Sequence, residues 1–170
     1  MEGSNRDAQG KEKVTEIKTF SVPFVLDVLQ NNISISTNTS SELSREERIS
    51  QAIKLHLQGK ISQATKYYQN FINLGWNDHR VFSNYGAILQ GIGKLKAAEL
   101  SYRKAIEIKP NYADAHLNLG IILSDLGKLE EAELSYRKAI EIKTDFVEAH
   151  SSLGNLLRNL AKLEEAELSY

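Results

Sequence analysis

The 170-residue sequence contains no cysteine, only two prolines and one tryptophan, and its charges nearly cancel. Without cysteine, the chain can form neither disulfide bonds nor thiolate metal sites. The net charge of −1, from 21 basic and 22 acidic residues, provides no basic excess for nucleic acid or an anionic membrane. No apolar run approaches the roughly 18 residues needed to cross a bilayer.

The N-terminus also lacks the features of a secretion signal. Residues 1–7, with the sequence MEGSNRD, do not combine a basic start with an apolar core. We therefore expect a cytoplasmic protein whose partners include neither nucleic acid nor a membrane.

What the sequence does contain is a repeat. The string AELSYRKAIEIK occupies residues 98–109 and again residues 132–143, and residues 166–170 begin it a third time. This period of 34 residues predicts stacked units, each of which buries its apolar face against its neighbours. Because such stacks present an extended surface, we expect the function to lie in that surface and not in a catalytic pocket.

The units are expected to be pairs of helices that follow a polar arm. Residues 1–44 are interpreted as an arm and linker, largely disordered, with an apolar island at residues 20–30. That island either covers the first repeat or serves as a binding or targeting element. Order should begin at Ser44, which can form a capping box with Glu47. The expected helices span residues 45–58 and 61–74, 79–92 and 95–108, 113–126 and 129–142, and 147–160 and 163–170.

Glycine marks the turn inside the first three pairs. Gly59, Gly93 and Gly127 stand where a positive φ lets the chain reverse sharply, whereas Ala161 occupies the corresponding position of the fourth pair. Three residues are expected to cap the later first helices: Asp78, Asn111 and Asp145.

This pattern resembles the tetratricopeptide repeat (TPR). The second copy carries the matching residues Phe82, Tyr85, Gly86, Leu89, Gly93, Ala98, Tyr102, Ala105 and Pro110. The resemblance implies an all-α, right-handed superhelical solenoid of stacked antiparallel helix pairs over residues 45–170. Its repeats would be residues 45–78 (degenerate), 79–112, 113–146 and 147–170 (truncated). The repeats look like those of bacterial, especially cyanobacterial, multi-repeat proteins and of O-GlcNAc-transferase-type TPR domains.

The glycines of the first helices should allow close helix packing. Gly86, Gly120 and Gly154 recur one repeat apart, and we expect each to let the two helices of its pair approach closely. Tyr102 and Tyr136 are expected to fill the wedge between successive pairs.

No pattern indicates catalysis, a cofactor or a metal. His116 and His150 occupy equivalent sites roughly 8–10 Å apart, too far apart to share one metal ion at about 2 Å from each nitrogen, so packing between helices is expected. Ser101 and Ser135 have no histidine at a fixed spacing. The chain also has no glycine-rich phosphate loop or zinc-binding HExxH helix. We therefore expect a protein that is not an enzyme.

A ligand is expected on the concave face, which the first helices line. The candidate binding residues are Arg80, Ser83, Asn84, Asn118, Asp125, Ser152, Asn155 and Arg158. Asn84 and Asn118 are one repeat apart and resemble the asparagine ladder of O-GlcNAc transferases, which implies a grip on peptide backbone. The alternative is that asparagine merely suits a solvent-facing groove.

Related repeats clamp the C-terminal carboxylate of heat-shock chaperones with lysine and arginine. The corresponding positions here hold Ser83, Ala87, Asp114, Leu117 and Ile121, so that clamp is missing.

Three hypotheses of function follow. The first is a non-catalytic scaffold that binds a peptide or helix of a protein partner. The second is a substrate-recruiting or spacer segment of a larger glycosyltransferase- or sulfotransferase-like protein. The third is self-association through the uncapped C-terminal end.

Overall fold

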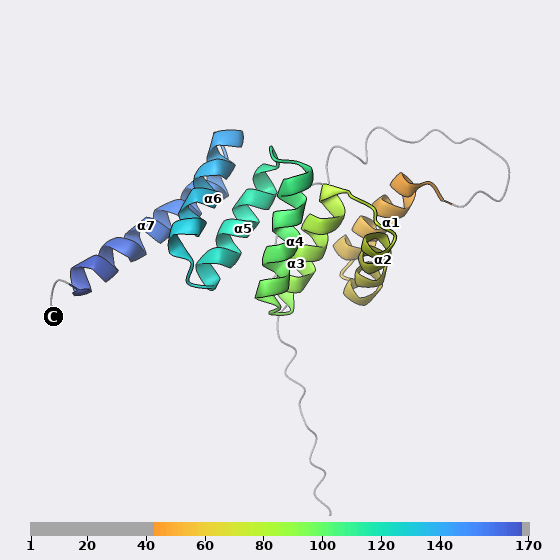
Figure 1. The fold of residues 1–170 in the computed structure, drawn as a ribbon, viewed down its shortest axis with the longest axis horizontal. Coiled ribbons are helices and arrows are strands. Elements are labelled where there is room, and N and C mark those ends of the chain that lie inside the picture. The colour runs from red at the N-terminus through yellow and green to blue at the C-terminus, as the bar shows by residue number, and fades with distance from the viewer. Residues whose placement is uncertain (1–42, 168–170) are drawn as a thin grey trace, which may run out of the picture.

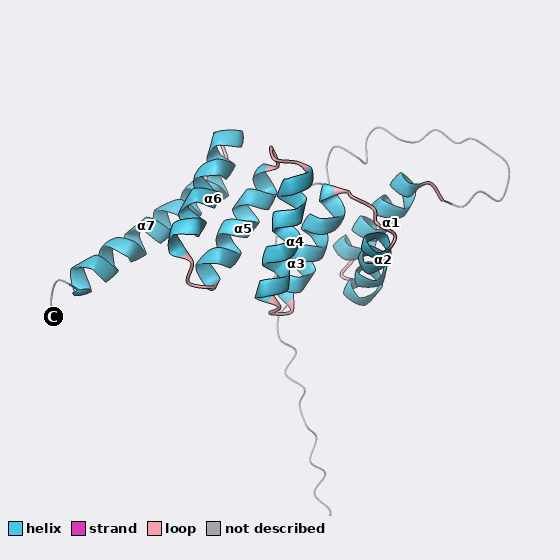
Figure 2. Cartoon of the chain, viewed as in Figure 1, coloured by secondary structure: helices cyan, strands magenta, loops and turns pink. Residues whose placement is uncertain are grey.

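The protein is an all-α helical repeat solenoid, as the sequence predicts. The computed structural model describes the backbone of residues 43–167 and the side chains through residue 161. Within these residues the regular structure consists of seven helices and no strand (Figure 1, Figure 2). They are α1 Arg45–Leu57, α2 Ile61–Asn73, α3 His79–Gly91, α4 Leu95–Ile108, α5 Ala113–Asp125, α6 Leu129–Ile142 and α7 Val147–Glu167.

Part of the interpretation lies outside this range. The N-terminal arm up to residue 42, with its apolar island, falls outside the described residues. None of the helices described is long and apolar enough to cross a membrane.

The helix starts follow the predicted capping at two of the four positions. The Glu47 amide donates to Ser44 Oγ at 3.2 Å while the Ser44 amide donates to Glu47 Oε2 at 2.7 Å, which completes the capping box. Asp78 Oδ1 accepts from the Arg80 amide at 2.9 Å. The predictions for Asn111 and Asp145 are wrong. α5 begins one residue later, after Tyr112 and without a side-chain cap, and α7 begins at Val147, after Phe146.

The turns inside the pairs are made by the predicted glycines. Gly59, Gly93 and Gly127 have φ values of +72°, +75° and +74°. Residues with a side chain rarely adopt this conformation, so glycine favours a turn between the first and second helix.

The fourth pair differs from the prediction. The sequence predicts helices at residues 147–160 and 163–170, but α7 is one continuous helix from Val147 to Glu167. The physical reason is Ala161, since alanine is the best helix former and is disfavoured at positive φ. Because position 161 holds alanine and not glycine, the chain continues as a helix there instead of reversing.

The stacking of the pairs defines an inner side. α2 packs on α3, α4 on α5, and α6 on α7, so each second helix supports the first helix of the next pair. In addition, α3 contacts α5 and α5 contacts α7, whereas α2, α4 and α6 make no comparable contacts with one another. The first helices of the second, third and fourth units therefore lie closer together, on the inner side of the stack.

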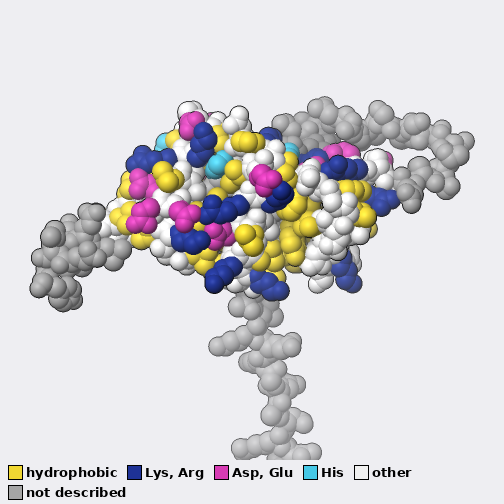
Figure 3. Space-filling view, in the orientation of Figure 1, with side chains coloured by type: hydrophobic (Ala, Val, Ile, Leu, Met, Phe, Trp, Pro, Cys, Tyr) yellow, Lys and Arg dark blue, Asp and Glu magenta, His cyan; other side chains and the backbone are white. Residues whose placement is uncertain are grey.

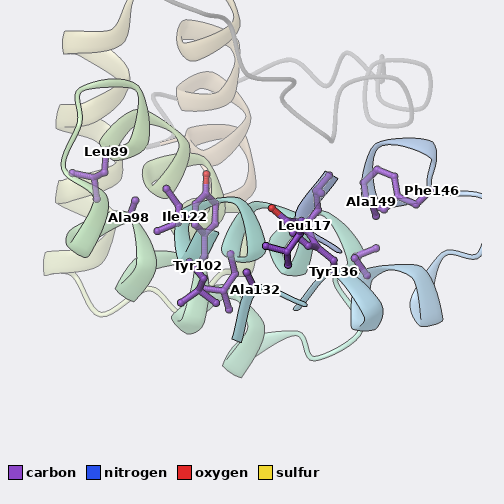
Figure 4. Packing of buried hydrophobic residues seen from close by; sticks show 14 residues of the cluster. Leu89, Ala98, Tyr102, Leu117, Ile122, Ala132, Tyr136, Phe146 and Ala149 are labelled. Carbon is purple, nitrogen blue, oxygen red and sulfur yellow. The ribbon is translucent and has the colours of Figure 1, made fainter. Parts of the chain in front are cut away.

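The main core joins the second, third and fourth units (Figure 4). Tyr102 and Tyr136 are buried in it, together with Ile122, Ala132 and Ala149. Each tyrosine ring covers the glycine of its own pair: a Cβ at Gly86 would lie 3.0 Å from Tyr102, and one at Gly120 would lie 2.6 Å from Tyr136. The glycines thus make room for the tyrosine rings. The core cluster that contains these rings extends into the next pair.

The first pair shares a second core with α3, in which Tyr68, Phe71 and Val81 are fully buried. Tyr85 of α3 packs against both cores. Trp76, in the connection to α3, stacks on Phe71 with ring centroids 4.8 Å apart.

Ion pairs link the second helices at the surface. Arg103 of α4 pairs with Glu131 of α6 at 2.6 Å, and Glu99 accepts from Lys128 at 3.0 Å. Figure 3 shows basic and acidic side chains interspersed on one face of the solenoid. The charged residues that recur in the second helices therefore form ion pairs with one another between neighbouring repeats.

Candidate functional site

The candidate site is the surface of α1, α3, α5 and α7 on the inner side of the stack, which we call the inner face. Residues 34 positions apart occupy equivalent places on it because the repeat has that period. All eight predicted site residues lie on three of these helices, α3, α5 and α7.

On α3, the inner face is occupied by ion pairs. Arg80 Nη2 lies 2.7 Å from Glu46 Oε2 on α1 and 2.8 Å from Asp78 Oδ2. Hydrogen bonds to Glu46, which has the larger effect, and to Asp78 raise the pKa of Arg80. The hydrogen bond between Arg80 and Glu46 in turn lowers the pKa of Glu46. The Arg80 charge is therefore already balanced by two carboxylates.

The neighbouring candidates on α3 are covered. Asn84 is only 3% exposed, and its Nδ2 donates to the Arg80 carbonyl at 2.9 Å. Ser83 is buried as well. Asn84 therefore does not present its amide to a ligand as the sequence predicts, because the side chain is buried and bonded to its own helix. Asn84 and Asn118, which is half-buried, do not form an open row.

The accessible candidates lie on α5 and α7. Asp125, Asn155 and Arg158 are exposed, and Asn118 and Ser152 are half-buried. Arg158 Nη2 donates to Asn155 Oδ1.

These candidates form a two-by-two arrangement with one apolar member. Asn118 and half-buried Ile121 lie one turn apart on α5, and Ser152 and Asn155 take the equivalent places on α7. The arrangement offers amide and hydroxyl groups around one apolar side chain.

Carboxylates dominate the charge on this part of the inner face. Asp114 and Glu148 occupy equivalent positions in the first turns of α5 and α7, where the helix dipole favours negative charge. Burial raises the pKa of Asp114; Lys143 opposes this and Glu148 adds to it. With Asp125 also exposed, acidic groups outnumber the single accessible Arg158 among these residues.

The histidines and serines singled out in the sequence have structural partners. His116 Nε2 lies 2.9 Å from the Pro110 carbonyl and His150 Nε2 lies 2.8 Å from the Thr144 carbonyl, so each ties its helix to the preceding turn. Ser101 Oγ donates to the carbonyl of Ala97 at 3.0 Å. Among the side chains that the structure describes, residues 43–161, no group of three His, Asp or Glu is placed to hold a metal ion.

An apolar surface on α7 escaped the sequence interpretation. Leu157 is 40% exposed, whereas the equivalent Leu89 and Leu123 are 6% and 1% exposed. The signal in the sequence was Ala161, which stands where the other pairs have their turn glycine. Because α7 continues through Ala161, no second helix folds back over Leu157.

The fold and the inner face define a TPR-type repeat protein. Residues 50–169, more than half of the chain, match the family described as the middle TPR-like domain of cilia and flagella-associated protein 70. The chain belongs to this family. No curated protein sequence matches it.

Solved TPR structures share the fold. The first TPR of Spaghetti (RPAP3) bound to the HSP90 peptide SRMEEVD has a TM-score of 0.63 and 24% identity, over 67% of this chain and 90% of that one. A MamA protein has a TM-score of 0.64 and 25% identity, over 71% of this chain and 66% of that one. The Yersinia enterocolitica type III secretion chaperone SycD, in complex with a peptide of the translocator YopD, has a TM-score of 0.62 and 25% identity, over 72% and 98%.

Proposed function

We propose that this protein is a non-catalytic scaffold that binds a segment of a partner protein on the inner face of α5 and α7. The observation that carries the proposal is the set Asn118, Ile121, Ser152 and Asn155, which occupies two equivalent positions on each of two neighbouring inner-face helices. Similar solved domains support it, since one holds an HSP90 peptide and another a YopD peptide.

The chemistry of the inner face favours a neutral or basic segment. Asparagine offers both a donor and an acceptor, so Asn118 and Asn155 can bind the amides of an extended chain or the side chains of a helix. Ile121 provides an apolar contact between them. Asp114 and Glu148 would repel a partner carboxylate, since like charges in contact are unfavourable.

The test begins with a peptide selected from a displayed random library against the whole chain. Binding is then titrated by calorimetry for the wild type and for the double variant Asn118→Ala/Asn155→Ala. Each lost hydrogen bond should cost on the order of 1 kcal/mol, so affinity should fall roughly tenfold or more. The thermal melt should change little, since Asn155 is exposed and Asn118 half-buried.

Two controls sharpen the result. Leu134→Ala removes a side chain that is 68% exposed on α6, away from the inner face, and should leave affinity unchanged. The acidic peptide SRMEEVD should not bind this protein. The RPAP3 domain, which is solved with that peptide, serves as the positive control. Equal loss in the Leu134 variant, no loss in the asparagine variant, or tight binding of SRMEEVD would count against the proposal.

A further inference from the structure

We propose that residues 163–170 of a second copy of this chain dock on α7, so that two copies exchange this helical segment. The docking surface consists of Leu153, Gly154 and Leu157, which we call the α7 face. By helical spacing it lies on a different side of α7 from Ser152 and Asn155, so it is separate from the inner face.

The α7 face is a core position without its cover. Leu157 is 40% exposed, while the equivalent Leu123 on α5 is 1% exposed beneath α6. A Cβ at Gly154 would meet nothing within 4 Å, whereas one at Gly120 would meet the ring of Tyr136 at 2.6 Å. The surface that receives a second helix in the third pair is therefore open in the fourth unit.

The chain itself carries the segment that fits this surface. Residues 163–170 read LEEAELSY, which is identical to residues 129–136 at the start of α6. In α6 this stretch buries Ala132, Ser135 and Tyr136 in the third pair. The α7 face therefore continues the established interface between first and second helices, and Tyr170 is the counterpart of Tyr136.

The segment cannot reach the face of its own α7 while that helix is continuous. At a rise of about 1.5 Å per residue, residue 166 lies about 18 Å along the axis from residue 154. Figure 1 shows the second half of α7 extending past the stack with no helix beside it. The barrier to folding back is Ala161, which replaces a glycine of positive φ.

A second copy satisfies both surfaces at once. First and second helices run antiparallel within a pair, so two continuous α7 helices packed antiparallel place each segment on the other's face. The contact is reciprocal about a twofold axis, as exchange of an identical element between protomers requires. An unrelated partner would cover only one of the two complementary surfaces.

The first test is mass by light scattering across a wide range of concentration. The wild type should be a concentration-dependent dimer. Ala161→Gly restores the turn glycine, so the segment can fold back on its own α7 and the protein should become monomeric. Ser151→Gly weakens the same helix at an exposed site away from the turn and should leave the dimer intact. A monomeric wild type, or an Ala161→Gly variant that dimerises like the wild type, would overturn the proposal.

The second test locates the contact by crosslinking. Because the chain has no cysteine, single-cysteine variants react only at the introduced site. A mixture of Gly154→Cys and Tyr170→Cys chains should form a mixed dimer with a short thiol crosslinker, while each variant alone should not. If the protein is a dimer but the mixture does not crosslink, the two copies associate in another way and the proposed exchange of residues 163–170 is wrong. Peptide binding on the inner face should survive Ala161→Gly, which keeps this test separate from the proposed function.

Discussion

At the scale of single residues, glycine has three different roles in this chain. Gly59, Gly93 and Gly127 are turn residues with positive φ. Gly120 instead makes room for a neighbouring ring, and Gly91 ends α3 with open space where a side chain would stand. The same residue type is therefore constrained by backbone, by packing or by neither.

The difference between Gly120 and Gly91 can be measured. Gly120→Ala should destabilise the protein, because the added Cβ would lie 2.6 Å from the Tyr136 ring and the core must shift. Gly91→Ala should stabilise it by up to about 1 kcal/mol, because alanine favours helix and the site is open. Urea unfolding of both variants checks this, and a shift of the same sign in both would contradict it.

Equivalent buried positions have also diverged. Tyr102 Oη donates to Gln90 Oε1 at 3.1 Å, and one repeat earlier the corresponding residues are Tyr68 and His56. Their rings meet edge to face with centroids 6.2 Å apart, and Tyr68 Oη and His56 Nδ1 are buried without a hydrogen-bond partner. The first pair therefore lacks a bond that the second pair makes.

At the scale of elements, α1 and α2 are attached to the stack through fewer groups than the other pairs. Their core is separate from the main one and extends only to Val81 and Ile88 of α3, and the Glu46–Arg80 ion pair also joins α1 to α3. Such a unit can open without unfolding the rest, because stability in a solenoid is shared between neighbours.

Arg80→Ala should therefore loosen the first pair selectively. Without the guanidinium, Glu46 loses its partner and Asp78 is left half-buried, so amide hydrogen exchange should become faster in α1 and α2 than in α5 and α6. Arg137→Ala, which removes an exposed pair with Glu133, is the matched control and should change little. Uniform acceleration along the stack would show that Arg80 does not couple the first pair.

At the scale of the whole molecule, the histidines set how stability responds to mild acid. Burial lowers the pKa of His56, His79 and His116 from the usual 6.5. Below pH 6.5 the unfolded chain then binds protons that the folded chain does not, so stability is lost as the pH falls toward the folded pKa values. The paired carboxylates Glu46 and Asp78, whose pKa values are lowered, lose their contribution only at more acidic pH.

The urea midpoint should therefore fall between about pH 7 and pH 5, the range in which histidine titrates. His56→Gln should reduce this fall, since glutamine does not titrate and can bond Tyr68 as Gln90 bonds Tyr102. A midpoint that is flat in this range, or a His56→Gln variant with the same slope, would contradict the assignment.

The sequence by itself determined the first three helix pairs and their turns. The period of 34 residues, the capping box at Ser44 and the turn glycines depend on local backbone chemistry, which residues close in sequence specify. The sequence also showed that Ala161 replaces the turn glycine, but only the structure showed that α7 continues through this position.

The tertiary structure alone decided which inner-face residues are available. Spacing placed Asn84 and Asn118 on one row, yet Asn84 is buried and Arg80 is held by Glu46 from 34 residues away. Burial and charge balance depend on neighbours contributed by other repeats, and these neighbours differ from one inner-face helix to the next. A repeating sequence therefore fixes equivalent positions without making them equivalent in their surroundings, because the surroundings arise only when the units stack.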